Sequence, residues 1–195
     1  MSAFQAVRRR FKSCHPLQFG INMFLHDSNY LAARNNEDYY HFGRIRAPIP
    51  SWEEIFAEFD REYKIHLETG NKEIFKHQDR LGFVLHQMQT IPIVDQILKD
   101  ISRSHNIRQR QNFTALGYVS LSSESATYGR HKDVMDVWCW QMTGKTLWKV
   151  EGRKRNFEKV LEPGELIYVP RGMWHDTKPI TPRAGLSFGS EDLAS

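Results

Sequence analysis

Apolar residues recur at three- and four-residue steps in two stretches of the chain, which is the spacing of one face of an α-helix. The first stretch follows Ser51, and Glu54 three residues later completes the pattern of a capping box. Its apolar positions are Trp52, Ile55, Phe56, Phe59 and Tyr63. The second stretch begins at Pro92, a residue tolerated in the first helical turn, and its apolar positions are Val94, Ile97, Leu98 and Ile101. We expect the first face to lie against a sheet and both faces to be part of the core.

From Asn112 onward the pattern changes to short segments rich in β-branched and aromatic residues. We expect strands at residues 114–121, 134–142, 146–150, 165–169 and 183–188. Gly144 and the Pro163-Gly164 pair mark tight turns between them. Many short strands in succession indicate a sandwich or a barrel, and jelly-roll and cupin barrels enclose a cavity suited to a small ligand.

The length of 195 residues and the hydrophobic content of 40% fit one domain with one substantial core. Residues 1–50 show no sustained period and end at Pro48 and Pro50, so we expect an irregular arm that packs onto the body. The predicted fold is mainly β with flanking helices. It has this arm at 1–50, a helical region at 51–108 and a double-stranded β-helix (jelly-roll) barrel at 110–190.

The formal net charge is +4 and the isoelectric point is near 9.1, with basic clusters at residues 153–155 and 103–110. Such a balance favours a negatively charged partner. Because Asp and Glu are interleaved through most of the chain, we interpret the clusters mainly as solvated surface, and nucleic-acid binding stays open as an alternative.

Cys14 and Cys139 are the only cysteines, too few for a disulfide scaffold or a four-thiolate zinc site, so we expect a reducing compartment such as the cytoplasm. No apolar run approaches the roughly 20 residues that span a bilayer, and we expect no membrane contact. The N-terminus lacks the apolar stretch of a secretory signal. Because this segment is rich in arginine, an organelle-targeting leader stays as a weak alternative.

The candidate chemistry lies in two histidines and an aspartate. Residues two apart in a strand share a face, so His131 and Asp133 can converge on one ion. His175 follows Asp133 by 175 − 133 = 42 residues, enough for short strands to return it to the same place. Two imidazoles and one carboxylate suit non-haem Fe(II) because three positions stay open, whereas zinc prefers four-coordinate N and S sites. Considered one at a time, His131 can also be a surface residue, Asp133 a hydrogen-bond acceptor in a turn, and His175 a hydrogen-bonded residue at the start of a strand.

Two longer runs carry a resemblance to a known family. The run from His131 to Trp148 resembles the HxDxxDVxxxQxxGxxxW strand pair of JmjC and cupin-like 2-oxoglutarate oxygenases. Its matching positions are His131, Asp133, Asp136, Val137, Gln141, Gly144 and Trp148. The later run resembles their LxPGDxxYxPxGxWH segment, with matches at Leu161, Pro163, Gly164, Tyr168, Pro170, Gly172, Trp174 and His175.

The resemblance implies that His131, Asp133 and His175 are Fe(II) ligands and that 2-oxoglutarate is the cosubstrate. It further implies oxidative decarboxylation to succinate and carbon dioxide with hydroxylation of an unactivated C–H bond. A protein side chain is the expected substrate, and an RNA base or small metabolite is the next choice. A metal-binding cupin that uses no 2-oxoglutarate is the alternative, and a metal-free structural barrel is a third possibility.

One departure from the family concerns the cosubstrate. Thr146 occupies the position where the family usually places a Lys or Arg that pairs with the far carboxylate. By alternation Lys145 and Lys149 face outward. The resemblance implies that Arg183 serves instead, because related oxygenase subfamilies anchor the same carboxylate with an Arg on the last strand, and Ser187 shares its face. A solvated strand end remains the alternative interpretation of Arg183. The expected hydroxyl donors toward the cosubstrate are Tyr118 and Tyr128.

Overall fold

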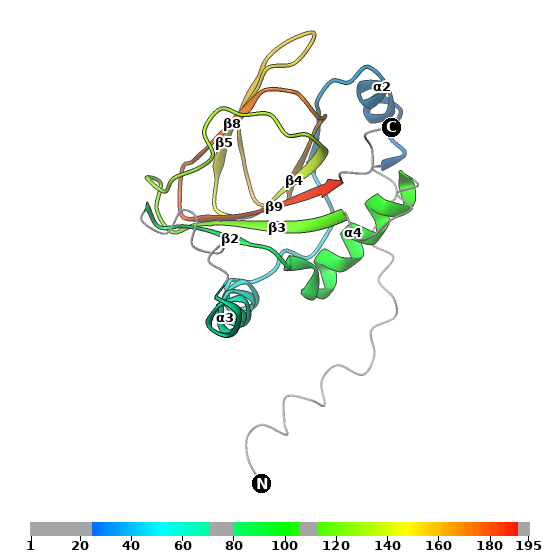
Figure 1. Cartoon of the computed structure of the whole chain (residues 1–195). Coiled ribbons are helices and arrows are strands. Elements are labelled where there is room, and N and C mark those ends of the chain that lie inside the picture. Colours follow the sequence, from blue (N-terminus) through cyan, green and yellow to red (C-terminus); the bar gives the residue numbers. More distant parts are fainter. Residues whose placement is uncertain (1–24, 71–79, 106–112, 191–195) are drawn as a thin grey trace.

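The computed structural model describes residues 25–70, 80–105 and 113–190, in which two antiparallel sheets face each other (Figure 1). The larger sheet has the strand order β1 (Tyr40–Arg44), β7 (Glu165–Val169), β4 (Asp136–Thr143), β9 (Arg183–Ser190), β3 (Phe113–Ser120) and β2 (Gly82–Leu85). The smaller sheet has the order β6 (Phe157–Leu161), β5 (Thr146–Val150) and β8 (His175–Pro179). Together they form the predicted double-stranded β-helix, a jelly roll.

The structure contains the two helices and five strands that the sequence pattern predicts. All five predicted strands appear, with ends within two residues of those expected. The helices are α3 (Trp52–Thr69) and α4 (Pro92–Ser104). The capping box is confirmed, because the Glu54 N–H donates to Ser51 Oγ at 3.2 Å and the Ser51 N–H donates to Glu54 Oε2 at 2.8 Å. No helix in the described ranges is long and apolar enough to cross a membrane.

The prediction of an irregular arm is wrong for its described part. This part contains the helix α2 (Ser28–Asn35) and the strand β1, which pairs with β7. The partner of β1 lies more than 120 residues away in sequence, so its hydrogen bonds leave no local signal. The short strands β2, β6 and β8 were also missed, and β2 interrupts the region expected to be helical. The first 24 residues of the arm, with the basic N-terminus and Cys14, lie outside the described residues, as do residues 106–110 of a predicted basic cluster.

The predicted buried face of α3 is wrong in part. Phe56 and Tyr63 are 49% and 39% exposed, whereas Glu58 and Glu62 are buried. The carboxylate of Glu62 accepts hydrogen bonds from the backbone N–H groups of His86 and Gln87 at 2.7 and 2.8 Å, and Glu58 accepts one from a threonine hydroxyl. These bonds turn the helix, so an acidic stripe faces inward and part of the aromatic stripe is left in solvent.

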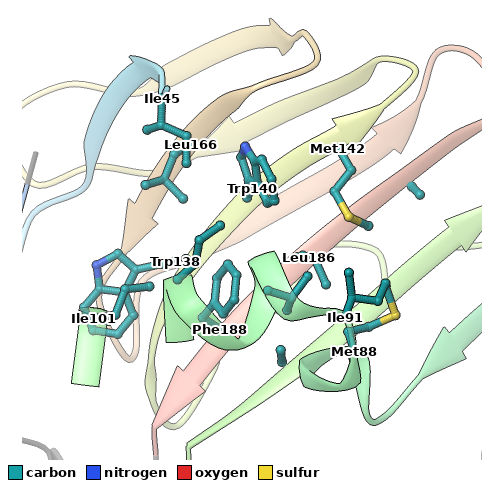
Figure 2. Close-up of a cluster of buried hydrophobic side chains, with 14 of the residues drawn as sticks. Ile45, Met88, Ile91, Ile101, Trp138, Trp140, Met142, Leu166, Leu186 and Phe188 are labelled. Atoms are coloured by element: carbon teal, nitrogen blue, oxygen red, sulfur yellow. The ribbon is translucent and has the colours of Figure 1, made fainter. Parts of the chain in front are cut away.

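Two separate cores follow from the alternation of side chains in the larger sheet. One core lies between the outer face of this sheet and the segments around it, α4 among them, and contains Trp138, Trp140, Leu186 and Phe188 (Figure 2). The other lies inside the barrel. Its buried members are Val137, Cys139, Trp148, Val150, Leu161, Ile167, Val169 and Met173. Since β4 and β9 present large apolar residues outward, their inward positions are available for a site.

Candidate metal centre

His131 and His175 face each other across the opening of the barrel. They form an isolated antiparallel bridge in which each backbone N–H donates to the carbonyl of the other, at 2.9 and 2.8 Å. Residues paired in this way point to the same side of the sheet, and the ring centroids are 4.3 Å apart. The local backbone therefore brings together two imidazoles that are distant in sequence.

Asp133 completes the cluster. Its Oδ1 lies 3.7 Å from Nε2 of His131, and its Oδ2 lies 3.5 Å from Nε2 of His175. One potential ligand atom from each residue lies within 4.8 Å of the other two. The Gly172 N–H donates to the Asp133 carbonyl at 2.8 Å, which holds this loop against the turn that precedes β8. The structure thus brings together the three predicted ligands.

Hydrogen bonds orient both imidazoles for coordination. Nδ1 of His131 lies 2.8 Å from the Gly129 carbonyl, and Nδ1 of His175 lies 3.1 Å from the Met173 carbonyl. If each Nδ1–H donates to its carbonyl, the lone pair of each Nε2 is directed at the cluster. Burial lowers the pKa of His175, which favours the neutral form that metals bind.

A cavity of about 70 Å³ adjoins the three residues inside the barrel. At 10–15 Å³ for each water molecule, this volume holds roughly five to seven waters. Its polar lining includes Tyr118, Ser120, Gln141, Thr177, Arg183 and Ser187. Trp148 closes one side and stacks on the His175 ring at 5.9 Å with an interplanar angle of 18°. The arrangement is a small polar chamber beside a metal-binding cluster.

Arg183 is buried in the wall of this cavity and is only 7% exposed, so its interpretation as a solvated strand end is wrong. Its Nε has no hydrogen-bond partner among the described residues. The ionisable groups that act on it are Tyr118 and Cys139, and no carboxylate of the described residues is among them. Burial lowers the pKa of Arg183 to about 10, so the guanidinium stays charged at neutral pH. A buried cation without an anion is costly, which indicates a negatively charged ligand.

The other predicted cosubstrate residues lie in different places. Tyr118 lines the cavity, and burial raises the pKa of its hydroxyl, which therefore remains a donor. Tyr128 is at the rim, half exposed, with its ring 5.7 Å from that of His131. Ser187 lines the cavity and accepts a 3.8 Å contact from the Cys139 thiol. Thr146 is fully buried but is not part of the lining, so the structure does not bring it to the cavity.

Several polar lining residues were missed in the sequence, Thr177 and Ser120 among them. Thr177 lies two positions after His175 on β8, so strand alternation alone places it on the same face. Ser120 pairs with Arg183 across β3 and β9, a register that no local pattern indicates. Lys145 and Lys149 do face outward, where each forms an exposed ion pair with a glutamate.

The topology defines the fold of this protein as a double-stranded β-helix, a jelly roll with the candidate metal residues at its cavity. The family model of the JmjC domain matches residues 151–193, which include β6 to β9, His175 and Arg183. No curated protein sequence matches the chain.

Several solved structures are similar to the chain. YcfD, a ribosomal oxygenase from Escherichia coli, has 19% identity and a TM-score of 0.43, and the alignment covers 56% of this chain and 31% of that one. HEPD from Streptomyces albus, solved with 2-hydroxyethylphosphonate and Fe(II), has 15% identity and a TM-score of 0.35 over 41% of this chain and 18% of that one. Procruciferin, an 11S globulin from Brassica napus, has 12% identity and a TM-score of 0.44 over 61% and 28%. The chain thus spans less than a third of the length of each of these proteins.

Proposed function

We propose that this protein is an Fe(II)- and 2-oxoglutarate-dependent oxygenase that hydroxylates an unactivated C–H bond. One observation carries the proposal: a two-histidine, one-carboxylate cluster and a buried arginine without an anionic partner share the same cavity. The cluster fits a metal with open coordination sites, and the arginine fits a dicarboxylate cosubstrate. The JmjC match over the second half of the barrel supports the same class.

The residues of the chain have distinct roles in this proposal. His131, Asp133 and His175 hold the metal, and the carbonyls behind the two imidazoles fix their orientation. Bound together, Fe(II) and 2-oxoglutarate supply the oxidation of a C–H bond by O₂, with succinate and carbon dioxide as the other products. Arg183 neutralises the far carboxylate of the cosubstrate.

The residues around the cavity limit the access of water and help to orient the cosubstrate and the ring of His175. The hydroxyl of Tyr118 is a hydrogen-bond donor for the cosubstrate at the cavity, and Ser187 offers a second polar group on β9, the strand that carries Arg183. The apolar core inside the barrel excludes water beyond this polar chamber. Trp148 stacks on the ring of His175 and restricts its rotation.

The substrate is proposed to be a protein side chain. The side chains of His131 and Asp133 are each 32% exposed, so the metal would be approached from the surface of the barrel rather than through a closed tunnel. An open approach suits a residue carried on a polypeptide, while an RNA base or a small metabolite are the other substrates to test. Mass spectrometry of candidate proteins after incubation with Fe(II), 2-oxoglutarate and O₂ should detect one added oxygen atom.

The central test is spectroscopic. Mixing the protein anaerobically with Fe(II) and 2-oxoglutarate should give a weak visible charge-transfer band, which His131→Ala and Asp133→Ala should lose. Lys149→Gln is a matched control, because this residue is next to Trp148 but points away from the cavity. Succinate release on addition of O₂ should follow.

The second candidate is a metal-binding cupin that uses no 2-oxoglutarate. Thr146 favours it, since this residue replaces the usual basic residue and lies away from the cavity lining. Iron binding without a spectral response to 2-oxoglutarate would select this function over the first.

A further inference from the structure

The bridge between the two candidate ligand histidines is supported by a sheet on one side only. His175 begins β8 and pairs with Val150 of β5, whereas His131 belongs to no strand and is held by the two backbone hydrogen bonds of the bridge. The segment from Leu121 to Met135 that contains His131 forms no strand. The position of one imidazole relative to the other therefore depends on additional contacts.

Such contacts lie on the opposite face of the same bridge. Because side chains alternate, Lys132 and Trp174 point away from the two histidines, toward solvent. The guanidinium carbon of Arg130 lies 3.9 Å from the centroid of the Trp174 ring, and the Lys132 ammonium lies 5.4 Å from it. These are cation–π distances that tie the loop to the residue before His175.

A second pair of contacts joins this group to Glu151, the residue that follows β5. Nε and Nη2 of Arg130 donate to the two carboxylate oxygens of Glu151, at 2.6 and 2.9 Å. The Glu151 N–H in turn donates to the Trp174 carbonyl at 2.9 Å. Arg130, Glu151 and Trp174 thus form a closed ring of contacts, here called the outer clasp, around the backbone that carries His175.

We propose that Arg130 is a positioning residue which, through the outer clasp, holds His131 opposite His175 and so sets the affinity for the metal. An exposed ion pair alone contributes little to a fold. The geometry here is more demanding, because one planar guanidinium is stacked on a ring and bonded by its edge to a carboxylate. A lysine has no such plane and cannot make both contacts.

The inference rests on the metal site of the proposed function and is independent of 2-oxoglutarate. Its test is a titration of the full chain with Co(II), followed by the visible absorption of the bound ion. Arg130→Ala should weaken Co(II) binding about tenfold, the low end of the effect of removing an outer partner of a metal ligand. Arg130→Lys should not restore it. Arg153→Ala, which removes another exposed cation from an ion pair with Glu37, is the charge-matched control and should bind Co(II) as the wild type does.

Variants of the ring distinguish positioning from a general loss of stability. Trp174→Phe keeps an aromatic face and should retain most of the affinity, whereas Trp174→Ala should lose as much as Arg130→Ala. The double variant Arg130→Ala/Trp174→Ala should lose less than the sum of the two single losses, because both changes break the contact between the guanidinium and the ring. Thermal unfolding of the metal-free proteins shows which variants are folded. If an alanine variant does not fold, the Co(II) affinities of Arg130→Lys and Trp174→Phe test the proposal instead.

The outcomes separate the two proposals. Wild-type affinity in Arg130→Ala, or full rescue by Arg130→Lys, overturns the role of the clasp. Failure of the wild-type protein to bind Co(II) overturns the metal site and the clasp with it. Normal Co(II) binding with the predicted losses, but no response to 2-oxoglutarate, supports the clasp and refutes the oxygenase.

Discussion

The replacement of Arg183 by methionine tests the proposed cosubstrate site most directly. Burial lowers the pKa of this guanidinium to about 10, well below its ordinary value. The difference corresponds to about 3 kcal/mol of cost for holding the charge unpaired in the barrel. Because the folded-state pKa is lowered for a base, this cost is fully present below pH 10 and is relieved only as the pH rises above it. A carboxylate that pairs with Arg183 should recover a similar amount.

Two measurements follow for Arg183→Met. The dissociation constant of 2-oxoglutarate in the presence of Fe(II) should rise about 100-fold, since 3 kcal/mol is about two factors of ten. The ligand-free protein should unfold at an equal or higher urea concentration, because a methionine has no charge to bury. Iron affinity should be unchanged, and Lys145→Met, which removes an outward cation, is the control. Unaltered affinity for 2-oxoglutarate together with lower stability would refute the assignment and make Arg183 a structural residue.

Three further predictions concern stability. Glu62→Gln should lower the free energy of unfolding in urea by about 2 kcal/mol, since a buried charged acceptor of two backbone N–H groups is weakened, and Glu53→Gln should have no effect. Ile55→Ala should cost about 3 kcal/mol and Phe56→Ser less than about 0.5 kcal/mol, and the reverse order would contradict the observed rotation of α3. Burial lowers the pKa of His105 to about 4, so the folded state binds fewer protons than the unfolded state and stability should fall by about 3 kcal/mol as the pH drops from 6.5 to 4. His105→Gln should lose this dependence, and an unchanged pH profile would place the titration elsewhere.

The candidate metal residues were predictable because their signal is local. His131 and Asp133 are two residues apart, and His175 follows a strand and a turn of typical composition. Arg183 followed from the resemblance, which implies an Arg on the last strand when the usual cation is replaced by Thr146. Strand alternation accounts for the inward position of Arg183 on β9, whereas His131 and Asp133 lie in a segment without a strand, where the bridge to His175 brings them to the site.

The rotation of α3 could not be predicted in this way. Hydrophobic periodicity treats a carboxylate as a solvent-facing group, but Glu62 accepts hydrogen bonds from backbone groups 24 and 25 residues later in the chain. The same limit applies to β1, whose pairing with β7 is set by a distant segment. The rotation of α3 and the pairing of β1 both depend on unpaired backbone groups in distant parts of the fold. A local sequence pattern contains no information about these groups.

The division of β4 between two faces constrains how this barrel can change over generations. Trp138 and Trp140 face one way, and Cys139 and Gln141 face the other. Substitutions at the second pair can therefore alter the chemistry of the chamber while the packing beneath α4 is preserved. An inserted or deleted residue in this strand would exchange the two sets and ruin both, so new specificities should arise here by replacement and never by a shift of register.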